Sequence, residues 1–315
     1  MQRILALLLC VAGPLAADPP RIVADIAPVH SLVAMVTEGV TEPELLIPAN
    51  ASAHDLALKP SQARALTRAD LVVWVGPELS PGLGRALDAT AERTLALLRV
   101  PGTQLYPARD AALFGDMGLS GHVEDAHAGH DHSHDGIDPH AWLDPVNAVM
   151  WLTALAETLA ELDPEHAAAY RDNAVRAVAR LSVMTARMDD QLEPARHSGL
   201  IAFHDAFQYF EARFGLSMVG AITPSDGSDP GPARLSALRD AARDGAVVCA
   251  FAEPQFNAGL LEAVTQEAGL PVATLDPMGA NLTVGSDLYE ALLMQMSGAV
   301  TDCISMGVSQ AGSGE

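Results

Sequence analysis

Short apolar runs, each followed by a segment with apolar residues at helical spacing, recur along the first half of the chain. Residues 71–76 (Leu-Val-Val-Trp-Val-Gly) are apolar throughout, which is typical of a strand covered on both faces of a parallel sheet. The pattern predicts strands at 21–27, 44–47, 71–76 and near Leu105. It predicts helices at 28–38, 60–68 and 82–91, so this half is expected to consist of β/α units.

Two helices are predicted in the middle of the chain. The first begins at Pro145, with Asp144 as its N-cap, and runs to residue 162; the second covers 165–191. At roughly 27 residues the second helix would be about 40 Å long, which exceeds a typical crossover helix. Such a helix can form a rigid spine between two lobes. A coiled-coil dimer is the alternative, although the apolar stripe is irregular rather than heptad.

The β/α alternation restarts in the second half. Strands are predicted at 199–203, 216–222, 246–251 and 271–275, helices at 206–214, 234–243, 260–267 and 286–305, and a frayed tail at 307–315. A chain of 315 residues is long enough for two domains of ordinary size. The sequence therefore predicts an α/β protein whose two β/α lobes, 18–162 and 196–315, are joined by a linking helix at 163–195.

One long segment, from about 112 to 138, carries no such pattern, and a loop of that length is usually functional or disordered. Six of the eleven histidines of the chain fall between His122 and His140. Five of them lie among Gly and Asp residues that are too polar to pack: His122, His127, His130, His132 and His134. We expect an accessory loop that attracts metal ions; a low-complexity insert is the alternative.

The first 17 residues have a short basic start, an apolar core and an Ala-rich end, as a secretory signal peptide does. Cleavage after Ala17 would leave Asp18 first and predicts an exported protein. A lipoprotein signal at Cys10 is the alternative, but the apolar segment before this cysteine is very short. No other apolar run reaches the roughly 18 residues that a membrane helix needs.

The mature chain would hold 17 basic against 40 acidic residues, a net charge of −23. Such a surface repels nucleic acid and anionic membranes and attracts cations, so no nucleic-acid partner is expected. Two cysteines would remain, Cys249 and Cys303. In an oxidising compartment they favour one disulfide, which would stabilise the fold by about 4 kcal/mol. Two free buried thiols are the alternative.

Four possible metal ligands stand just beyond predicted strands or before predicted helices: His54, His140, His204 and Asp276. His140 has the most rigid setting, because Pro139 restricts its backbone and Trp142 can anchor the segment to a core. Two ligands come from each half, so they would meet in the cleft between the lobes. Three imidazoles and a carboxylate suit tetrahedral zinc, whereas manganese prefers more oxygen. Each residue could instead have a structural role: His204 could be a buried histidine bonded to Asp205, and Asp276 could cap a turn before Pro277.

The order and spacing of several motifs resemble one known family. They are Ala-His-Asp-Leu-Ala-Leu-Lys-Pro-Ser around His54, the histidine-rich loop, Asp-Pro-His-Ala-Trp-Leu-Asp-Pro around His140, Phe-His-Asp-Ala-Phe-Gln-Tyr-Phe around His204, Phe-Ala-Glu-Pro-Gln-Phe around Glu253, and Leu-Asp-Pro-Met-Gly around Asp276. Over essentially the whole mature chain this pattern is similar to the ZnuA-type periplasmic zinc-binding proteins of bacterial zinc ABC importers.

The resemblance implies two β/α lobes joined by a rigid helix, with His54, His140 and His204 as zinc ligands and Asp276 or a water completing the site. It implies that Glu253 orients a ligand imidazole, and it agrees with a disulfide between Cys249 and Cys303. It also implies delivery of zinc to a membrane permease by a monomer that is not an enzyme. Ala53 stands before His54 where many relatives have Pro or Glu, which excludes a glutamate as fourth ligand at that position.

Other functions remain open at this point. A manganese or iron importer component, or a metal-dependent adhesin, would share the fold that the resemblance implies. A secreted zinc hydrolase would also use three histidines and an open coordination position, with Glu253 as a possible base.

Overall fold

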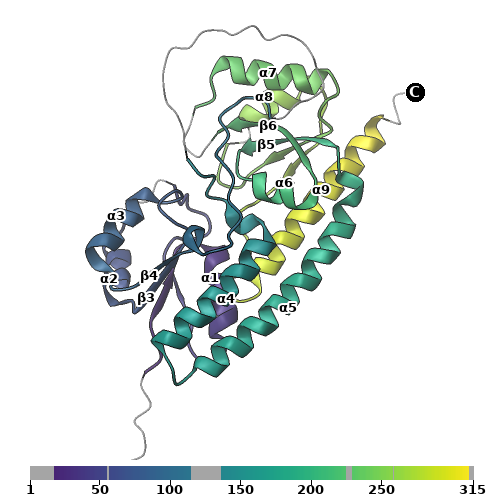
Figure 1. The fold of residues 1–315 in the computed structure, drawn as a ribbon. Coiled ribbons are helices and arrows are strands. Elements are labelled where there is room, and N and C mark those ends of the chain that lie inside the picture. The colour runs from purple at the N-terminus through teal and green to yellow at the C-terminus, as the bar shows by residue number, and fades with distance from the viewer. Residues whose placement is uncertain (1–17, 55–56, 115–135, 225–228, 258, 312–315) are drawn as a thin grey trace, which may run out of the picture.

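The computed structural model of the chain describes residues 18–54, 57–114, 136–224, 229–257 and 259–311. Figure 1 shows two lobes that lie beside a pair of long helices. The predicted signal peptide and the five loop histidines, His122 to His134, lie outside the described residues. Among the helices that are described, none is both long and apolar enough to cross a membrane.

The first lobe is built on a parallel sheet with the strand order β2-β1-β3-β4. Its strands are β1 (Ile22–Ala24), β2 (Glu44–Leu45), β3 (Leu71–Trp74) and β4 (Thr94–Ala96). Its helices are α1 (Ala27–Thr37), α2 (Pro60–Arg68) and α3 (Pro81–Thr90). Every residue of β3 is buried, as its continuous apolar run predicts.

The prediction of a strand near Leu105 was wrong, because the fourth strand is Thr94–Ala96. This strand lies at the edge of the sheet and its residues are partly exposed, so it lacks the apolar run that marks a buried strand. Leu105 belongs instead to an irregular segment that leads to an isolated bridge between Pro107 and Ile137.

The second lobe repeats the topology of the first, with the strand order β6-β5-β7-β8 and all pairs parallel. Its strands are β5 (Gly199–His204), β6 (Ser217–Thr223), β7 (Cys249–Ala252) and β8 (Val272–Thr274). Its helices are α6 (Gln208–Phe214), α7 (Pro232–Arg243) and α8 (Gly259–Thr265). In each sheet the strand order reverses beside the first strand of that lobe, β1 or β5. Open α/β sheets bind ligands at such a reversal, at the carboxyl ends of the strands.

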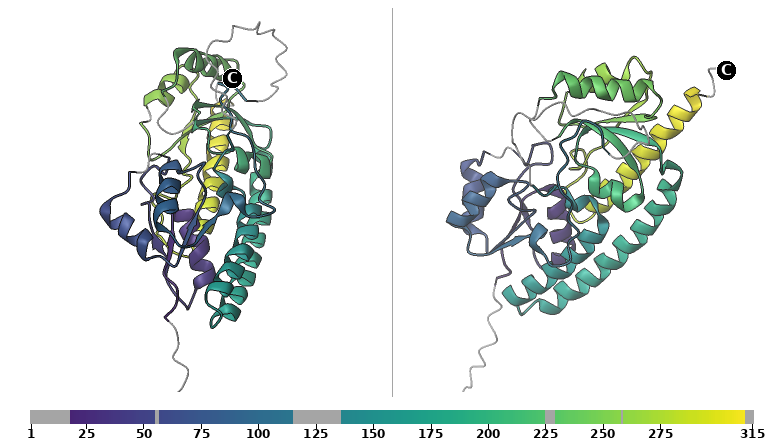
Figure 2. Two further views of the ribbon diagram at one scale, coloured as in Figure 1. Left: turned by 60° about the vertical axis from the view of Figure 1, so that its left-hand side comes forward. Right: turned by 45° about the horizontal axis from the view of Figure 1, so that its top comes forward.

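Helix α5 (Ala167–Leu192) is the long central helix that the sequence predicts, and α4 (Pro145–Leu162) precedes it. Asp144 caps α4 by accepting a hydrogen bond from the backbone N–H of Val146. The 26 residues of α5 span about 39 Å. Helix α5 packs on both α1 and α9 (Leu288–Ala311), and Figure 2 shows α4, α5 and α9 running alongside one another. The long helix therefore contacts elements from both halves of the chain.

The last helix, α9, continues to Ala311, so the prediction of a frayed tail from residue 307 was wrong for residues 307–311. The C-terminal half of α9 is attached to the second sheet by the disulfide between Cys249 in β7 and Cys303. Gly307 also lets the helix approach the carbonyl of Val248, because a Cβ there would lie 2.8 Å from that oxygen. The predicted disulfide is confirmed, and it holds this helix on the sheet.

The two halves are further joined by polar contacts beside the cleft. Arg213 of α6 binds both carboxylate oxygens of Asp144 at 2.7 Å. The indole N–H of Trp142 donates to the carbonyl of Pro277 at 2.9 Å, and the hydroxyl of Tyr289 donates to the carbonyl of Trp142 at 2.6 Å. These bonds fix the segment around residue 140 relative to the second lobe.

Candidate metal centre

Three histidines from separate parts of the chain meet between the lobes. His204 is the last residue of β5, His54 lies in the loop that follows β2, and His140 precedes a short 3-10 turn, Ala141–Leu143. The loop of His54 is anchored where the buried hydroxyl of Ser80 donates to the carbonyl of Ala53 at 2.6 Å. Each imidazole is thus placed by a different element, which is why no compact local motif marks the site.

The distances between these rings fit one metal ion. The Nε2 atom of His140 lies 3.4 Å from Nε2 of His54 and 3.4 Å from Nε2 of His204. Two nitrogens bound at about 2.0–2.1 Å to a tetrahedral zinc would lie about 3.4 Å apart. The possible ligand atoms of the three histidines all fall within 4.8 Å of one another. The cluster therefore has the spacing of a zinc site.

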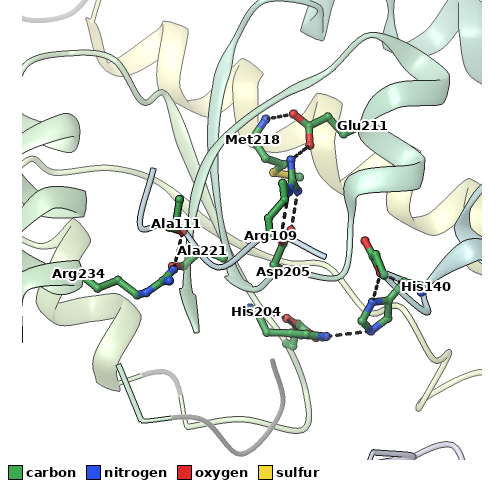
Figure 3. A network of polar contacts seen from close by, with 11 residues as sticks. Arg109, Ala111, His140, His204, Asp205, Glu211, Met218, Ala221 and Arg234 are labelled. Atoms are coloured by element: carbon green, nitrogen blue, oxygen red, sulfur yellow. Dashed lines mark hydrogen bonds and ion pairs between the residues drawn. The ribbon is translucent and has the colours of Figure 1, made fainter. Parts of the chain in front are cut away.

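Two of the three imidazoles are held by a buried carboxylate at the other ring nitrogen. Nδ1 of His140 lies 2.8 Å from Oδ1 of Asp138, and Nδ1 of His204 lies 2.6 Å from Oε1 of Glu253. Figure 3 shows the rings of His140 and His204 turned toward each other. A proton on Nδ1 that bonds to the carboxylate leaves Nε2 free for a metal and orients the ring.

Asp138 was not among the residues singled out from the sequence. Burial raises the pKa of its carboxyl to about 7, and the backbone N–H of His140 and the charge of Arg109 oppose that shift. The signal was present in Asp138-Pro139-His140, because proline turns the chain so that a carboxylate two residues earlier reaches the ring of His140. From the sequence, the motif was interpreted only as a restriction that Pro139 places on the backbone of His140.

Aromatic side chains line the site. The ring of Trp142 lies 5.1 Å from that of His140, and Phe256 lies 5.4 Å from His204 while stacking on Phe203 at 4.7 Å. The cavity onto which the three histidines open measures about 20 Å³, close to the volume that holds a single water molecule. A cavity of this size suits an ion and excludes organic ligands.

Asp276 follows β8 and is buried beside this cavity, but it does not belong to the cluster of three histidines. Its Oδ1 accepts hydrogen bonds from the backbone N–H groups of Met278 and Gly279, at 2.9 and 3.0 Å. Its Oδ2 accepts one from Ala280 at 2.6 Å. In this structure both carboxylate oxygens thus bind the turn that follows, while Pro277 and Met278 line the cavity itself.

A second cluster, which the sequence did not reveal, ties the segment before residue 115 to the second lobe. Arg109 donates to Asp205 from Nε at 3.0 Å and to Glu211 from Nη1 at 2.8 Å (Figure 3). Burial raises the pKa of Asp205, and the hydrogen bonds and charge of Arg109 oppose that shift. Because Asp205 follows His204 directly, this cluster also fixes the backbone at the end of β5.

The sequence matches, over residues 22–303, the family described as "Zinc-uptake complex component A periplasmic". The chain belongs to this family. It is 38% identical over 310 residues to the high-affinity zinc uptake system protein ZnuA of Paracoccus denitrificans, covering 93% of this chain and 94% of that protein. It is 35% identical over 309 residues to ZnuA of Yersinia pestis, and this match covers 96% of this chain and 97% of that protein.

Solved structures confirm the fold of this zinc-uptake family for the chain. A crystal structure of ZnuA superposes with a TM-score of 0.72 at 24% identity, covering 90% of this chain and 100% of that one. A laminin-binding adhesin of Streptococcus agalactiae gives a TM-score of 0.72 at 22% identity, covering 90% and 99%. A binding protein of Pseudomonas aeruginosa solved with Mn²⁺ gives 0.72 at 22% identity, covering 91% and 99%.

Proposed function

We propose that this protein captures zinc in the periplasm and delivers it to the membrane permease of a zinc ABC importer. The observation that carries this proposal is the group of three histidine Nε2 atoms, two of which lie 3.4 Å from the third. The names of the two curated relatives described above, both high-affinity zinc uptake proteins, agree with it. In this function zinc is the cargo, and His54, His140 and His204 are its ligands.

The donor atoms favour zinc over manganese. The cluster offers three imidazole nitrogens, and manganese prefers oxygen ligands. The fold alone does not select the cargo, because adhesins and a manganese-bound protein share it. Asp276 or a water molecule would complete a tetrahedral site, and Glu253 would orient His204.

The remaining parts of the chain are assigned by the same proposal. Residues 1–17 act as the cleaved signal peptide, and 18–162 and 196–315 form the two lobes joined by the helix region 163–195. The loop histidines from His122 to His134 bind zinc weakly and raise its local concentration. The protein acts as a monomer and does not bind nucleic acid.

A zinc hydrolase is less well supported than a carrier. Oε1 of Glu253 accepts hydrogen bonds from both Nδ1 and the backbone N–H of His204, at 2.6 and 3.1 Å. A carboxylate held in this way orients a ligand, whereas a general base must reach a water molecule on the metal. The cavity of about 20 Å³ also leaves no room for an organic substrate.

The test is a calorimetric titration of the metal-stripped mature protein with zinc, with manganese as competitor. We expect one tight zinc site that resists excess manganese, is lost in His54→Ala, and survives deletion of residues 122–134. His166→Ala is the matched control, because His166 bonds Asp163 at the start of α5 instead. Tight binding that vanishes with the deleted loop and persists in His54→Ala would overturn the proposal.

A further inference from the structure

Gln255 lines the same cavity as the three histidines and carries an unsatisfied oxygen. Its side-chain Oε1 is buried, and it has no hydrogen-bond partner among the described residues. Leaving a buried carbonyl oxygen without a donor costs about 1–3 kcal/mol, and native proteins rarely tolerate it. A group that donates a hydrogen bond to this oxygen is therefore expected in the working protein.

The orientation of the Gln255 amide is fixed by Asp276. Nε2 of Gln255 donates to Oδ1 of Asp276 at 3.4 Å. The carboxylate accepts hydrogen bonds only, and it already receives three from the backbone of residues 278–280. The amide nitrogen therefore faces Asp276, and the amide oxygen is the atom left to meet a donor.

The backbone around Gln255 is held as firmly as its side chain. The N–H of Phe256 donates to the carbonyl of Glu253 at 3.2 Å, which closes a turn with Pro254 at its second position. The stacking of Phe256 on Phe203, with an angle of 7° between the ring planes, fixes one end of this turn. Glu253 fixes the other end through His204. Gln255 is thus presented to the cavity by a rigid turn.

We propose that Gln255 accepts a hydrogen bond from a water molecule that occupies the fourth coordination position of the bound zinc. Asp276 then supports Gln255 and does not bind the metal. This inference rests on the proposed function, since three imidazoles leave one tetrahedral position open. A water bound to zinc is a strong donor, because the ion polarises its O–H bonds.

This arrangement has a consequence for the release of zinc. Three neutral imidazoles and a neutral water leave the full charge of the ion uncompensated by its direct ligands. A water held by one hydrogen bond exchanges more readily than a carboxylate ligand does. The fourth position is thus the one through which a ligand of the permease can first reach the metal, before any imidazole has to leave.

The test compares Gln255→Met and Asp276→Asn in the full mature chain, using chelator competition for zinc and the visible absorption of the Co²⁺-loaded protein. Met keeps the length of Gln but cannot accept a strong hydrogen bond, so zinc affinity should fall about tenfold. Asn keeps the acceptor oxygen that Gln255 uses and replaces only the oxygen that accepts from the N–H of Ala280, so Asp276→Asn should change the affinity by less than about threefold.

The spectrum supplies a readout that a structural role of Gln255 would not move. A metal-bound water loses a proton as pH rises, so the Co²⁺ absorption of the wild type should change with an apparent pKa. That pKa should shift by about half a unit or more in Gln255→Met and should stay in place in Asp276→Asn. A crystal structure of the zinc-loaded protein should place a water within hydrogen-bond distance of Gln255 Oε1.

A direct role for Asp276 as ligand would give the opposite pattern. Zinc affinity would then fall about a hundredfold or more in Asp276→Asn, and the Co²⁺ spectrum of the wild type would show no transition from a bound water. Either result overturns the inference and leaves the proposed function standing. A different result would count against the proposed function itself, namely that His140→Ala retains tight zinc binding.

Discussion

His204 and Glu253, which come from the ends of two neighbouring strands, bond to each other through Nδ1 and Oε1 at 2.6 Å. A carboxylate at this ring nitrogen raises the basicity of the imidazole and fixes its direction. We expect Glu253→Gln to weaken zinc binding by about tenfold and Glu253→Ala by up to about a hundredfold. Chelator competition measures both. Glu262→Gln in α8, which is exposed, is the matched control and should bind zinc as the wild type does.

Zinc affinity should also depend on pH through the three imidazoles. A metal binds only the unprotonated ring, and an ordinary imidazole has a pKa of about 6.5. Affinity should therefore fall steeply below about pH 6.5, with more than one proton displaced per zinc. Titrations in buffers of different ionisation enthalpy would count those protons. A dissociation constant that stays the same from pH 5.5 to 7.5 would contradict ligation by histidines.

Asp25 gives a pH dependence of stability that is independent of zinc. Burial raises the pKa of this carboxyl from 3.8 to about 7, against hydrogen bonds from the N–H groups of Val75 and Ile26. A raised pKa in the folded state means that the fold binds the proton more tightly than the unfolded chain does. Asp25 therefore does not lower the folding stability below about pH 4, where its carboxyl is protonated in both states. It lowers the stability most above about pH 7, where the carboxyl is ionised in both states.

We therefore expect the melting temperature of the metal-free protein to contain a component that decreases from pH 4 to pH 7. Asp25→Asn should remove this component, because the amide keeps an acceptor oxygen but does not ionise. Calorimetric scans of both proteins across this range measure the difference. The exposed Asp88 of α3 offers a control, since Asp88→Asn should leave the slope unchanged. Equal slopes in wild type and Asp25→Asn would show that Asp25 does not cause the effect.

The disulfide should matter for stability and not for zinc. It connects residues 54 positions apart, a loop for which the chain-entropy estimate is about 4 kcal/mol. Replacing Cys249 and Cys303 by Ser should lower the free energy of unfolding by about that amount. Zinc affinity should persist at temperatures where the variant is folded, because Cys249 begins β7 whereas Glu253 lies beyond its opposite end. Denaturant unfolding and zinc competition on the same samples separate the two effects.

The sequence predicted the elements whose apolar pattern is strong. Helix α4 begins and ends where its capping residues predict, at Pro145 and Leu162, because a capping aspartate and two prolines bound it. Strand β4 was missed because an edge strand of three partly exposed residues leaves no run of apolar residues to detect. Burial strengthens such a pattern, but an edge position alone does not hide a strand, because the edge strands β2, β6 and β8 were predicted.

For the metal centre, sequence reasoning predicted which residue types stand at strand ends but not which way each side chain points. His54, His140 and His204 are brought together as that reasoning expects. The carboxylate of Asp276 accepts hydrogen bonds from the N–H groups of the next residues, and Gln255 lines the cavity; the role of Asp276 as a ligand stays a prediction. The direction of each side chain depends on the geometry of the turn after its strand. Tertiary contacts with residues far along the chain set that geometry.

Both edges of the second sheet are protected. Beside the outer strand β6, the backbone N–H of Phe114 donates to the carbonyl of Val219 at 2.8 Å, and Leu113 forms a bridge with Gly220. A side chain at Gly220 would collide with the carbonyl of Ala112, so only glycine admits this covering segment. At the opposite edge, β8 has only three residues. Exposed strand edges recruit other chains into aggregates, and short or covered edges prevent this. We therefore expect the segment that leads toward the histidine-rich loop also to hinder edge-to-edge association of the protein through its second sheet.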